Sequence, residues 1–494
     1  MKYEEYRRYM QQTMDLGSAV ALLSWDKEVY MPPKSIRFRA QQIATLSAMA
    51  HNRFTDTSFG ESLKKLKDEQ TLTESQRRNI TLTIEDFEKE KKLPSSFVEE
   101  LSRTTAEANH HWALARQENA YHQFSPHLKK LIQLKRDEAE MRGYADKPYD
   151  ALLDIYEPGC TTQFLDSLFG NALPQIIQLI QKIKGYEQIS NDFLYTAYPT
   201  DNQWQLGIQL LKNMGYDFDY GRQDISAHPF TISFSPEDVR VTTRVDENDF
   251  SNMTWSCIHE GGHALYEQGL PAEEYGLPLG TSASLGIHES QSRLWENHVG
   301  RSMAYWTYWF PLLKEKFTSQ LREQDSKSFY HAINRIAPNL IRTEADELHY
   351  HIHVIIRFEI EKALINDQID VSGLNDFWNE KYKEYMGIDV PDDTNGILQD
   401  VHWSHGSFGY FPTYSLGSFY AAQFYAKAVS DMPNLETEIQ QGKTNALLNW
   451  LRSNVHQYGR KYLPNELCKK VTGEGLNVDY FLKYANEKFL DIYC

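Results

Sequence analysis

Residues 251–270 read SNMTWSCIHEGGHALYEQGL and contain a His-Glu-x-x-His pattern at His259, Glu260 and His263. Helical residues four apart lie on one face, so the two imidazoles can share a metal ion and Glu260 can act as the general base. Both intervening residues are glycine, and each glycine costs a helix interior roughly 1 kcal/mol relative to alanine. The stretch therefore predicts either a metal-binding helix, whose poor propensity metal coordination can offset, or a glycine turn that matches the pattern by chance.

The composition narrows the class of protein. The 494 residues carry a formal charge of −17, and no basic tract offsets it, which argues against a nucleic-acid or anionic-membrane partner. The four cysteines are far apart and without CxxC spacing, so we expect reduced thiols. No signal peptide and no stretch of roughly 20 apolar residues is present, so the expectation is a soluble cytoplasmic protein.

Most segments repeat apolar residues at three- and four-residue spacing, as in FRAQQIATLSAMAHNRF, which predicts a mainly α fold. Residues 228–250 differ, because alternating residues on both sides of a SPED turn predict a short β-hairpin. A strand beside a metal site can pair with an extended peptide. With no linker or repeat visible, we expect one domain over 1–494, with a helical part at about 1–220, a catalytic core with the hairpin at about 221–430, and C-terminal helices at about 431–494.

A zinc site of this type needs a third protein ligand. The extended motif with a third histidine is excluded, because Tyr266 and Gly269 stand where glycine and histidine are required. The next segment, IHESQSRLWENHVG, has helical spacing, and a helical hairpin would return one face of it to the metal. Spacing alone leaves Glu289, Glu296 and His288 all eligible as the third ligand.

A third group of residues follows in IRTEADELHYHIHVIIRFEIEKAL, from Ile341. As one helix, this segment would carry Arg342, Asp346, Tyr350, His353 and Arg357 on one stripe. Such a stripe is either functional or a buried ladder of ion pairs.

A fourth group lies in GILQDVHWSHGSFGYFPTYSLG, a glycine-punctuated stretch that we expect to be loop-like. It offers hydrogen-bond donors at Gln399, Asp400, His402, Tyr410 and Tyr414. Donors of this kind can stabilise the oxyanion of a tetrahedral intermediate.

Six ordered motifs together make the chain resemble the thermostable carboxypeptidase Taq family of metallocarboxypeptidases. They are HPF at His228, DVRVT at Asp238, HEGGH at His259, HESQ at His288, IRTEAD at Ile341 and GILQDVHW at Gly396. The likeness extends from about residue 20 to the C-terminus.

The resemblance implies a large helical fold around a deep groove and, usually, a homodimer. Carried over by motif, it makes His259, His263 and Glu289 the ligands of one divalent metal and Glu260 the general base. Zinc is the expected metal, and cobalt shares the ligand set. The implied activity is release of C-terminal amino acids from peptides with broad specificity and poor action on C-terminal proline.

Substrate recognition is less defined. A C-terminal carboxylate calls for a guanidinium, and Arg240 and Arg342 both stand in family motifs. His228, Asp346 and the donors of the fourth group are further candidates for substrate or transition-state contacts.

Departures from the family pattern are His349, His351 and His405, for which surface or core roles are favoured. The competing hypotheses are an oligoendopeptidase with the same metal site and a non-catalytic helical protein with a structural zinc.

Overall fold

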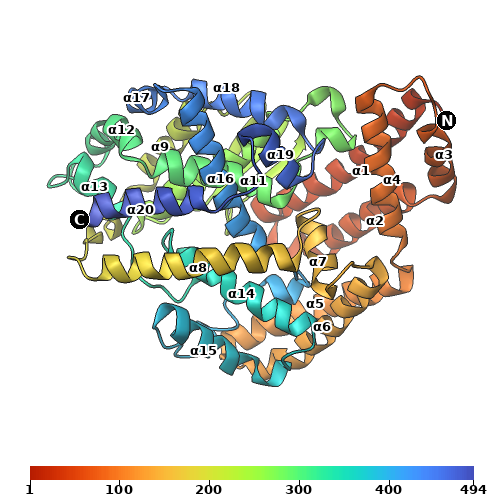
Figure 1. The fold of residues 1–494 in the computed structure, drawn as a ribbon, viewed down its shortest axis with the longest axis horizontal. Helices are drawn as coiled ribbons and strands as arrows, with labels where there is room; N and C mark the ends of the chain where they lie inside the picture. The colour runs from red at the N-terminus through yellow and green to blue at the C-terminus, as the bar shows by residue number, and fades with distance from the viewer. The chain divides into compact units, whose positions relative to one another are not determined.

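The computed structural model describes residues 1–494 and is mainly helical, with twenty α-helices and one small sheet (Figure 1). The chain divides into two compact units, each built from three segments. Unit 1 comprises 1–91, 190–333 and 424–475, and unit 2 comprises 92–189, 334–423 and 476–494. The expectation of one domain with three successive parts stays a prediction.

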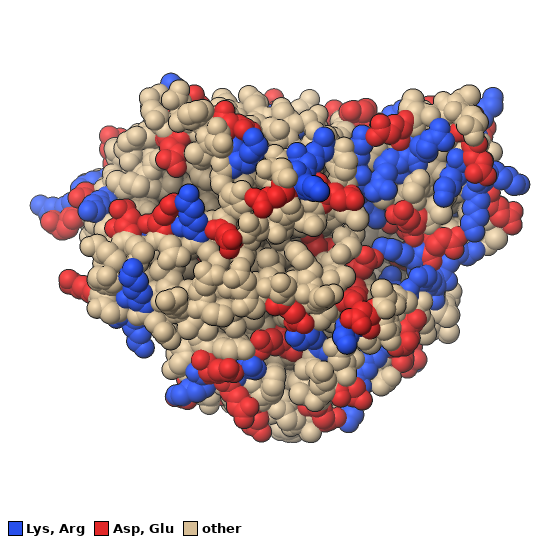
Figure 2. Space-filling model, viewed as in Figure 1, with Lys and Arg blue, Asp and Glu red and all other residues tan.

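Unit 1 begins with four helices that pack through an aromatic cluster, in which Tyr6, Phe59 and Phe87 are buried. Its helices are α1 (Tyr3–Val29), α2 (Ile36–Phe54), α3 (Thr57–Lys67), α4 (Glu74–Lys91), α9 (Thr200–Met214), α10 (Phe250–Glu267), α11 (Leu285–Arg293), α12 (Met303–Lys316), α13 (Ser326–Ile333), α17 (Leu435–Gln440), α18 (Asn445–Asn454) and α19 (Pro464–Thr472). Lys and Arg side chains are visible over α2 to α4, intermixed with Asp and Glu (Figure 2). This mixture agrees with a solvated surface.

The sheet of unit 1 has three strands in the order β1 (Gly221–Ile225), β3 (Asp238–Thr243) and β2 (Thr231–Ser235). The antiparallel pair β2–β3 confirms the predicted hairpin, with Thr231 opposite Val241. The parallel strand β1 was not expected, because GRQDI lacks the alternation that marks a half-buried strand. Strand β2 lies at an edge of the sheet.

Unit 2 is built from long helices, among which α5 and α6 lie side by side (Figure 1). Its helices are α5 (Ser95–Glu118), α6 (Tyr121–Arg142), α7 (Pro148–Tyr156), α8 (Thr162–Lys184), α14 (His349–Ile365), α15 (Leu374–Met386) and α20 (Asp479–Tyr493). Helix α16 (Pro412–Asp431) contributes its first half to unit 2 and its second half to unit 1. None of the helices in either unit has the length and apolarity needed to span a bilayer.

The predicted helix from Ile341 was wrong in its first eight residues. Arg342–Glu344 form a single 3-10 turn, and α14 begins only at His349. Asp346 explains the late start, because its Oδ1 accepts hydrogen bonds of 2.9 Å from the backbone N–H groups of Leu348 and His349. A side-chain acceptor of this kind satisfies the first unpaired N–H groups of a helix.

Candidate metal centre

Helix α10 carries the His-Glu-x-x-His pattern and begins at a capped end, where the Asp249 carboxylate accepts a hydrogen bond of 2.8 Å from the N–H of Ser251. His259 and His263 lie one turn apart. The Nε2 atoms of His259 and His263 lie 3.6 Å and 3.3 Å from Oε2 of Glu289 on α11. One ligand atom from each of these three side chains falls within 4.8 Å of the others, so together they could hold a metal ion.

The two glycines of the pattern explain how α11 comes so close to α10. A Cβ on Gly262 would lie 2.6 Å from Cα of Ser292 and 2.7 Å from the carbonyl oxygen of Gln291. A Cβ on Gly261 would lie 2.7 Å from Cδ2 of Leu211 on α9. Both positions are therefore occupied by neighbouring protein atoms, and the backbone of α11 is the closest neighbour of Gly262.

Glu289 is buried and held in place by Arg293, whose Nε donates to its Oε1 at 2.7 Å. Burial alone would raise the pKa of Glu289, but Arg293 and the two histidines lower it well below its usual range. The group is therefore an ionised carboxylate, and Oε2 is the oxygen that faces the imidazoles. Arg293 also contacts Glu296 at 3.3 Å, as expected for three residues on one helical face.

The other two eligible ligands lie on the far side of the imidazole rings. Oε2 of Glu296 is 2.9 Å from Nδ1 of His259. Nδ1 of His263 lies 3.1 Å from the carbonyl oxygen of His288, whose own Nε2 is 2.8 Å from Glu267. Because these contacts are made at Nδ1, Nε2 of each histidine is directed toward Glu289. In metal sites, a hydrogen bond at one ring nitrogen commonly fixes the tautomer and the orientation of the imidazole.

Glu260 is 8% exposed, and its Oε2 accepts a hydrogen bond of 2.7 Å from Oγ1 of Thr231 on β2. The same hydroxyl lies 2.9 Å from the carbonyl oxygen of Glu260. Thr231 thus fixes the candidate base against the edge strand. The sequence analysis did not single out Thr231, although its position directly after the HPF motif and at the start of an alternating strand was an available signal.

The remaining candidates of unit 1 lie on or next to the sheet. Arg240 makes two hydrogen bonds of 2.8 Å to the carboxylate of Asp238, and its guanidinium stacks 4.5 Å from the ring centroid of Trp25. His228 is exposed, and its carbonyl oxygen accepts a hydrogen bond of 2.6 Å from Ser226. Arg240 is therefore already matched by a carboxylate of its own strand.

Unit 2 brings four of its predicted residues into one buried cluster around Asp400. Nε and Nη2 of Arg342 donate to Oδ1 of Asp400 at 3.0 Å and 2.9 Å, and Nε of Arg357 donates to Oδ2 at 2.6 Å. Gln399 accepts from the N–H of Arg342 at 3.0 Å and from Arg357 at 2.8 Å, while Tyr350 contacts Nη1 of Arg342 at 3.2 Å. Although burial would raise it, the two arginines lower the pKa of Asp400, so the cluster contains two cations and one anion.

His402 is the neighbour of this cluster on the following loop. Its Nε2 lies 3.1 Å from the hydroxyl of Tyr414, and its ring contacts that of Tyr410 at 5.4 Å between centroids. Burial and then Arg342 lower the pKa of His402 to about 3, so the imidazole is neutral at physiological pH. Tyr414 lies in the first turn of α16 and not in a loop as expected.

Glu361 on α14 is a buried carboxylate that the sequence analysis missed. It accepts hydrogen bonds from Tyr149 at 2.6 Å, from Nε1 of Trp403 at 2.8 Å and from the N–H of Gly409 at 2.8 Å. Two of these donors, Trp403 and Gly409, lie at the two ends of the segment between His402 and Tyr410. Because a lone Glu in an apolar helix has many structural roles, its sequence context held no specific signal.

The additional histidines of unit 2 have core or peripheral positions. His351 is 1% exposed, with Nδ1 2.9 Å from Oγ of Ser415, and His349 is paired with Asp346 at 2.7 Å. His405 is exposed and contacts Asn109.

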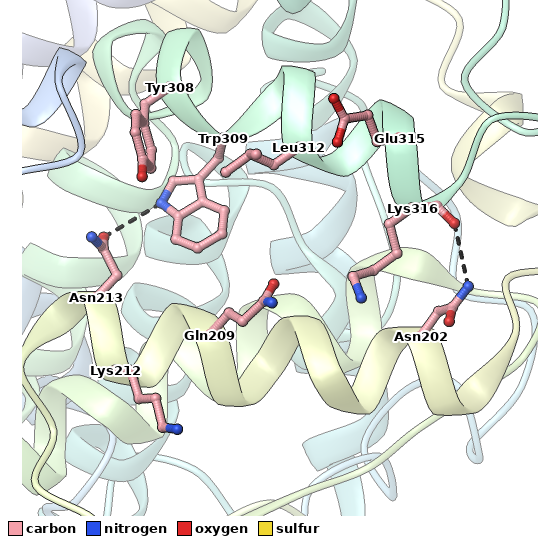
Figure 3. A pocket seen from close by; sticks show the side chains of 9 residues that line it. All are labelled: Asn202, Gln209, Lys212, Asn213, Tyr308, Trp309, Leu312, Glu315 and Lys316. Atoms are coloured by element: carbon pink, nitrogen blue, oxygen red, sulfur yellow. Dashed lines mark hydrogen bonds between the residues drawn. The ribbon is translucent and has the colours of Figure 1, made fainter.

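A separate cavity of about 690 Å3 lies between α9 and α12 in unit 1 (Figure 3). Its ends are marked by hydrogen bonds from Trp309 to Asn213 at 3.4 Å and from Asn202 to the carbonyl of Lys316 at 3.3 Å. It contains none of the predicted site residues, so it is not the candidate catalytic site.

Comparison with known proteins agrees with the geometry. The family model described as carboxypeptidase Taq (M32) metallopeptidase matches residues 5–489. Thermostable carboxypeptidase 1 of Thermus thermophilus is 38% identical, and carboxypeptidase 1 of Bacillus subtilis is 37% identical, each over 99% of this chain and 98–99% of the relative. The crystal structure of the M32 carboxypeptidase from Deinococcus radiodurans superposes with a TM-score of 0.98 at 36% identity, covering 99% of both chains. The chain that brings these His, His and Glu side chains together therefore belongs to the carboxypeptidase Taq (M32) family of metallopeptidases.

Proposed function

We propose that this chain is a metal-dependent carboxypeptidase that releases C-terminal amino acids from peptides. The observation that carries the proposal is the cluster of His259, His263 and Glu289, with Glu260 on the same helix, in a chain that belongs to a metallopeptidase family. We assign the first three residues as metal ligands and Glu260 as the general base.

The donor set fits a divalent transition metal. Two imidazole nitrogens and one carboxylate oxygen are the protein ligands of a catalytic zinc site, whereas structural sites close with four. We propose zinc first and cobalt as a second possibility, since both accept this ligand set. When bound, such a metal supplies Lewis acidity, which makes water more acidic and polarises a carbonyl group.

The protein residues supply the proton transfer. The Thr231 hydroxyl donates a hydrogen bond to Oε2 of Glu260. We therefore assign Oε1 as the atom that accepts a proton from the attacking water. The same carboxyl group then returns that proton to the leaving amine. Strand β2, which carries Thr231 at the edge of the sheet, offers main-chain groups to an extended peptide.

For the terminal carboxylate of the substrate we favour Arg342 over Arg240. Arg240 is neutralised by a bidentate pair with Asp238, whereas Arg342 and Arg357 share the single carboxylate of Asp400. The cluster around Asp400 therefore keeps an excess positive charge that can bind an anion. Asp346 acts in this proposal by fixing the start of α14.

Donors for the oxyanion are proposed from the loop after the Asp400 cluster. The neutral His402 and the hydroxyls of Tyr410 and Tyr414 lie together and can donate hydrogen bonds. Gln399 positions the two arginines, and His228 is retained as a candidate for contact with the peptide backbone.

The remaining properties rest on the family resemblance. We propose broad specificity with poor release of C-terminal proline, a homodimer and a cytoplasmic location. A series of dipeptidyl substrates with varied C-terminal residues tests the specificity, and analytical ultracentrifugation tests the homodimer.

One blocked-peptide experiment separates carboxypeptidase from oligoendopeptidase activity. Amidation of the C-terminus removes the carboxylate that the proposed Arg342 site binds, so cleavage of the amidated peptide should cease while the free acid is trimmed from its end. Internal cleavage of both peptides would favour the oligoendopeptidase. Absence of cleavage of either peptide by metal-loaded protein would favour a non-catalytic protein.

A further inference from the structure

Unit 2 contains a cavity of about 590 Å3 that plays no part in the proposed peptide hydrolysis. It lies along α5 and α6, it is bordered by the end of α7 and the turn at Gly406, and it is open to solvent. Leu101 and Ile155 give the cavity an apolar wall, and Lys135, Glu138 and Arg142 give it a charged wall.

Lys135 is a buried amine with unused hydrogen-bonding capacity; burial lowers its pKa, and the Glu138 carboxylate opposes that shift by favouring the ammonium form. The residue is only 4% exposed, and its Nζ makes one hydrogen bond, of 2.5 Å, to Oε2 of Glu138. An ammonium has three N–H donors, and burying a charge without partners is costly. Because Lys135 lines the cavity, a ligand there could accept hydrogen bonds from its remaining N–H groups.

Arg142 supplies a second cation to the same wall. Its Nε donates to Oε1 of Glu138 at 2.7 Å, and no other nitrogen of its guanidinium bonds to the protein. Both oxygens of Glu138 are therefore engaged, each by a different cation. The two basic side chains share this carboxylate, and all three groups line the cavity.

We propose that this cavity binds a small organic anion, whose carboxylate or phosphate group is held by Lys135 and Arg142 and whose apolar part packs on Leu101 and Ile155. The shared chemistry is an oxyanion that accepts N–H donors from both cations. A cavity with an apolar wall and a few convergent polar groups is the usual form of a small-molecule site.

Calorimetric titration of the metal-loaded protein with three probes, namely inorganic phosphate, acetate and 3-methylbutanoate, tests the proposal. We expect saturable binding, with 3-methylbutanoate tighter than acetate because of the apolar wall. Tighter binding of phosphate than of either carboxylate would support the site and identify phosphate as its anionic group.

Three variants locate the binding site. Arg142→Gln and Glu138→Gln should each weaken binding about tenfold, because the first removes one cation and the second removes the carboxylate that favours the charged form of Lys135. The matched control is Arg103→Gln on the same unit, since Arg103 is exposed on α5 and lies outside the cavity. Arg142 is partly exposed, so its replacement leaves the buried Lys135–Glu138 pair intact.

Two results would overturn the proposal. One is the absence of saturable heat with all three probes. The other is binding that Arg142→Gln and Glu138→Gln leave unchanged, since that binding would belong to another part of the protein, such as the metal centre.

Discussion

Oε2 of Glu296 lies 2.9 Å from Nδ1 of His259, on the side of the ring opposite the candidate metal cluster. The contact fixes the ring so that Nε2 faces Glu289. Spacing in the sequence made Glu296 an alternative third ligand, whereas its position indicates that it orients His259, which we propose as a ligand.

Replacing Glu296 with Gln should weaken metal binding by about 10- to 100-fold, because the loss of a carboxylate behind a metal-binding histidine lowers its basicity and frees its orientation. Competition with a chelator on the folded variant measures this affinity. Glu237→Gln is the matched control, since Glu237 is exposed. An unchanged affinity in Glu296→Gln would contradict the assigned role.

Glu260→Gln should retain the metal and lose activity by a factor of about 100 or more, since it removes the proposed general base but none of the ligands. Metal content by elemental analysis and kcat on a free-acid peptide are the two measurements. If kcat stayed near that of the wild type, another group would have to take the proton.

Arg342→Lys should raise KM more than it lowers kcat, because a lysine cannot replace the guanidinium at a bidentate site. Arg240→Lys is the matched comparison, and we expect a much smaller effect because Asp238 already pairs with Arg240. Steady-state kinetics on one peptide decide between them. A larger KM effect in Arg240→Lys would mean that Arg240, and not Arg342, binds the carboxylate of the substrate.

Gly262→Ala should destabilise the protein by about 1 to 3 kcal/mol, since the new methyl group would lie 2.6 Å from the backbone of α11. Gly17→Ala on α1 is the control, because a Cβ there meets nothing within 4 Å and alanine is the better helix former. Denaturant unfolding measures both. A Gly262→Ala protein as stable as the wild type would mean that α11 can shift away from α10 at little cost in free energy.

Glu361 should make stability depend on pH. Burial raises its pKa from 4.5 to about 7 in the folded chain, so between these values the folded state binds more protons than the unfolded state. Its contribution to stability is fully present below pH 4.5 and falls as pH rises to 7, by on the order of 3 kcal/mol.

Gln at position 361 does not titrate, which makes Glu361→Gln the reference for this effect. Between pH 5 and pH 8, the unfolding free energy of the wild type should fall relative to that of the variant. An equal difference at both pH values would show that Glu361 keeps one protonation state in this range.

The sequence by itself determined the local features of this protein. Apolar periodicity predicted helices such as α2, and alternation around the SPED turn predicted the pair β2–β3. Short-range geometry also placed His259 and His263 on one helical face, because residues four apart meet in any α-helix.

Only the tertiary structure decided which distant side chains meet. Helical spacing could not distinguish Glu289 from Glu296, because both lie on the face that Arg293 shares, and the approach of α11 to Gly262 sets which carboxylate reaches the imidazoles. Likewise, Asp346 caps the start of α14 instead of joining a helical stripe, and Asp400 binds both Arg342 and Arg357, which come from separate segments. Periodicity shows which face of a helix or strand is apolar. How closely two elements approach, and how each is rotated about its axis, depends on the side-chain volumes of both elements, so the sequence of one segment does not determine it.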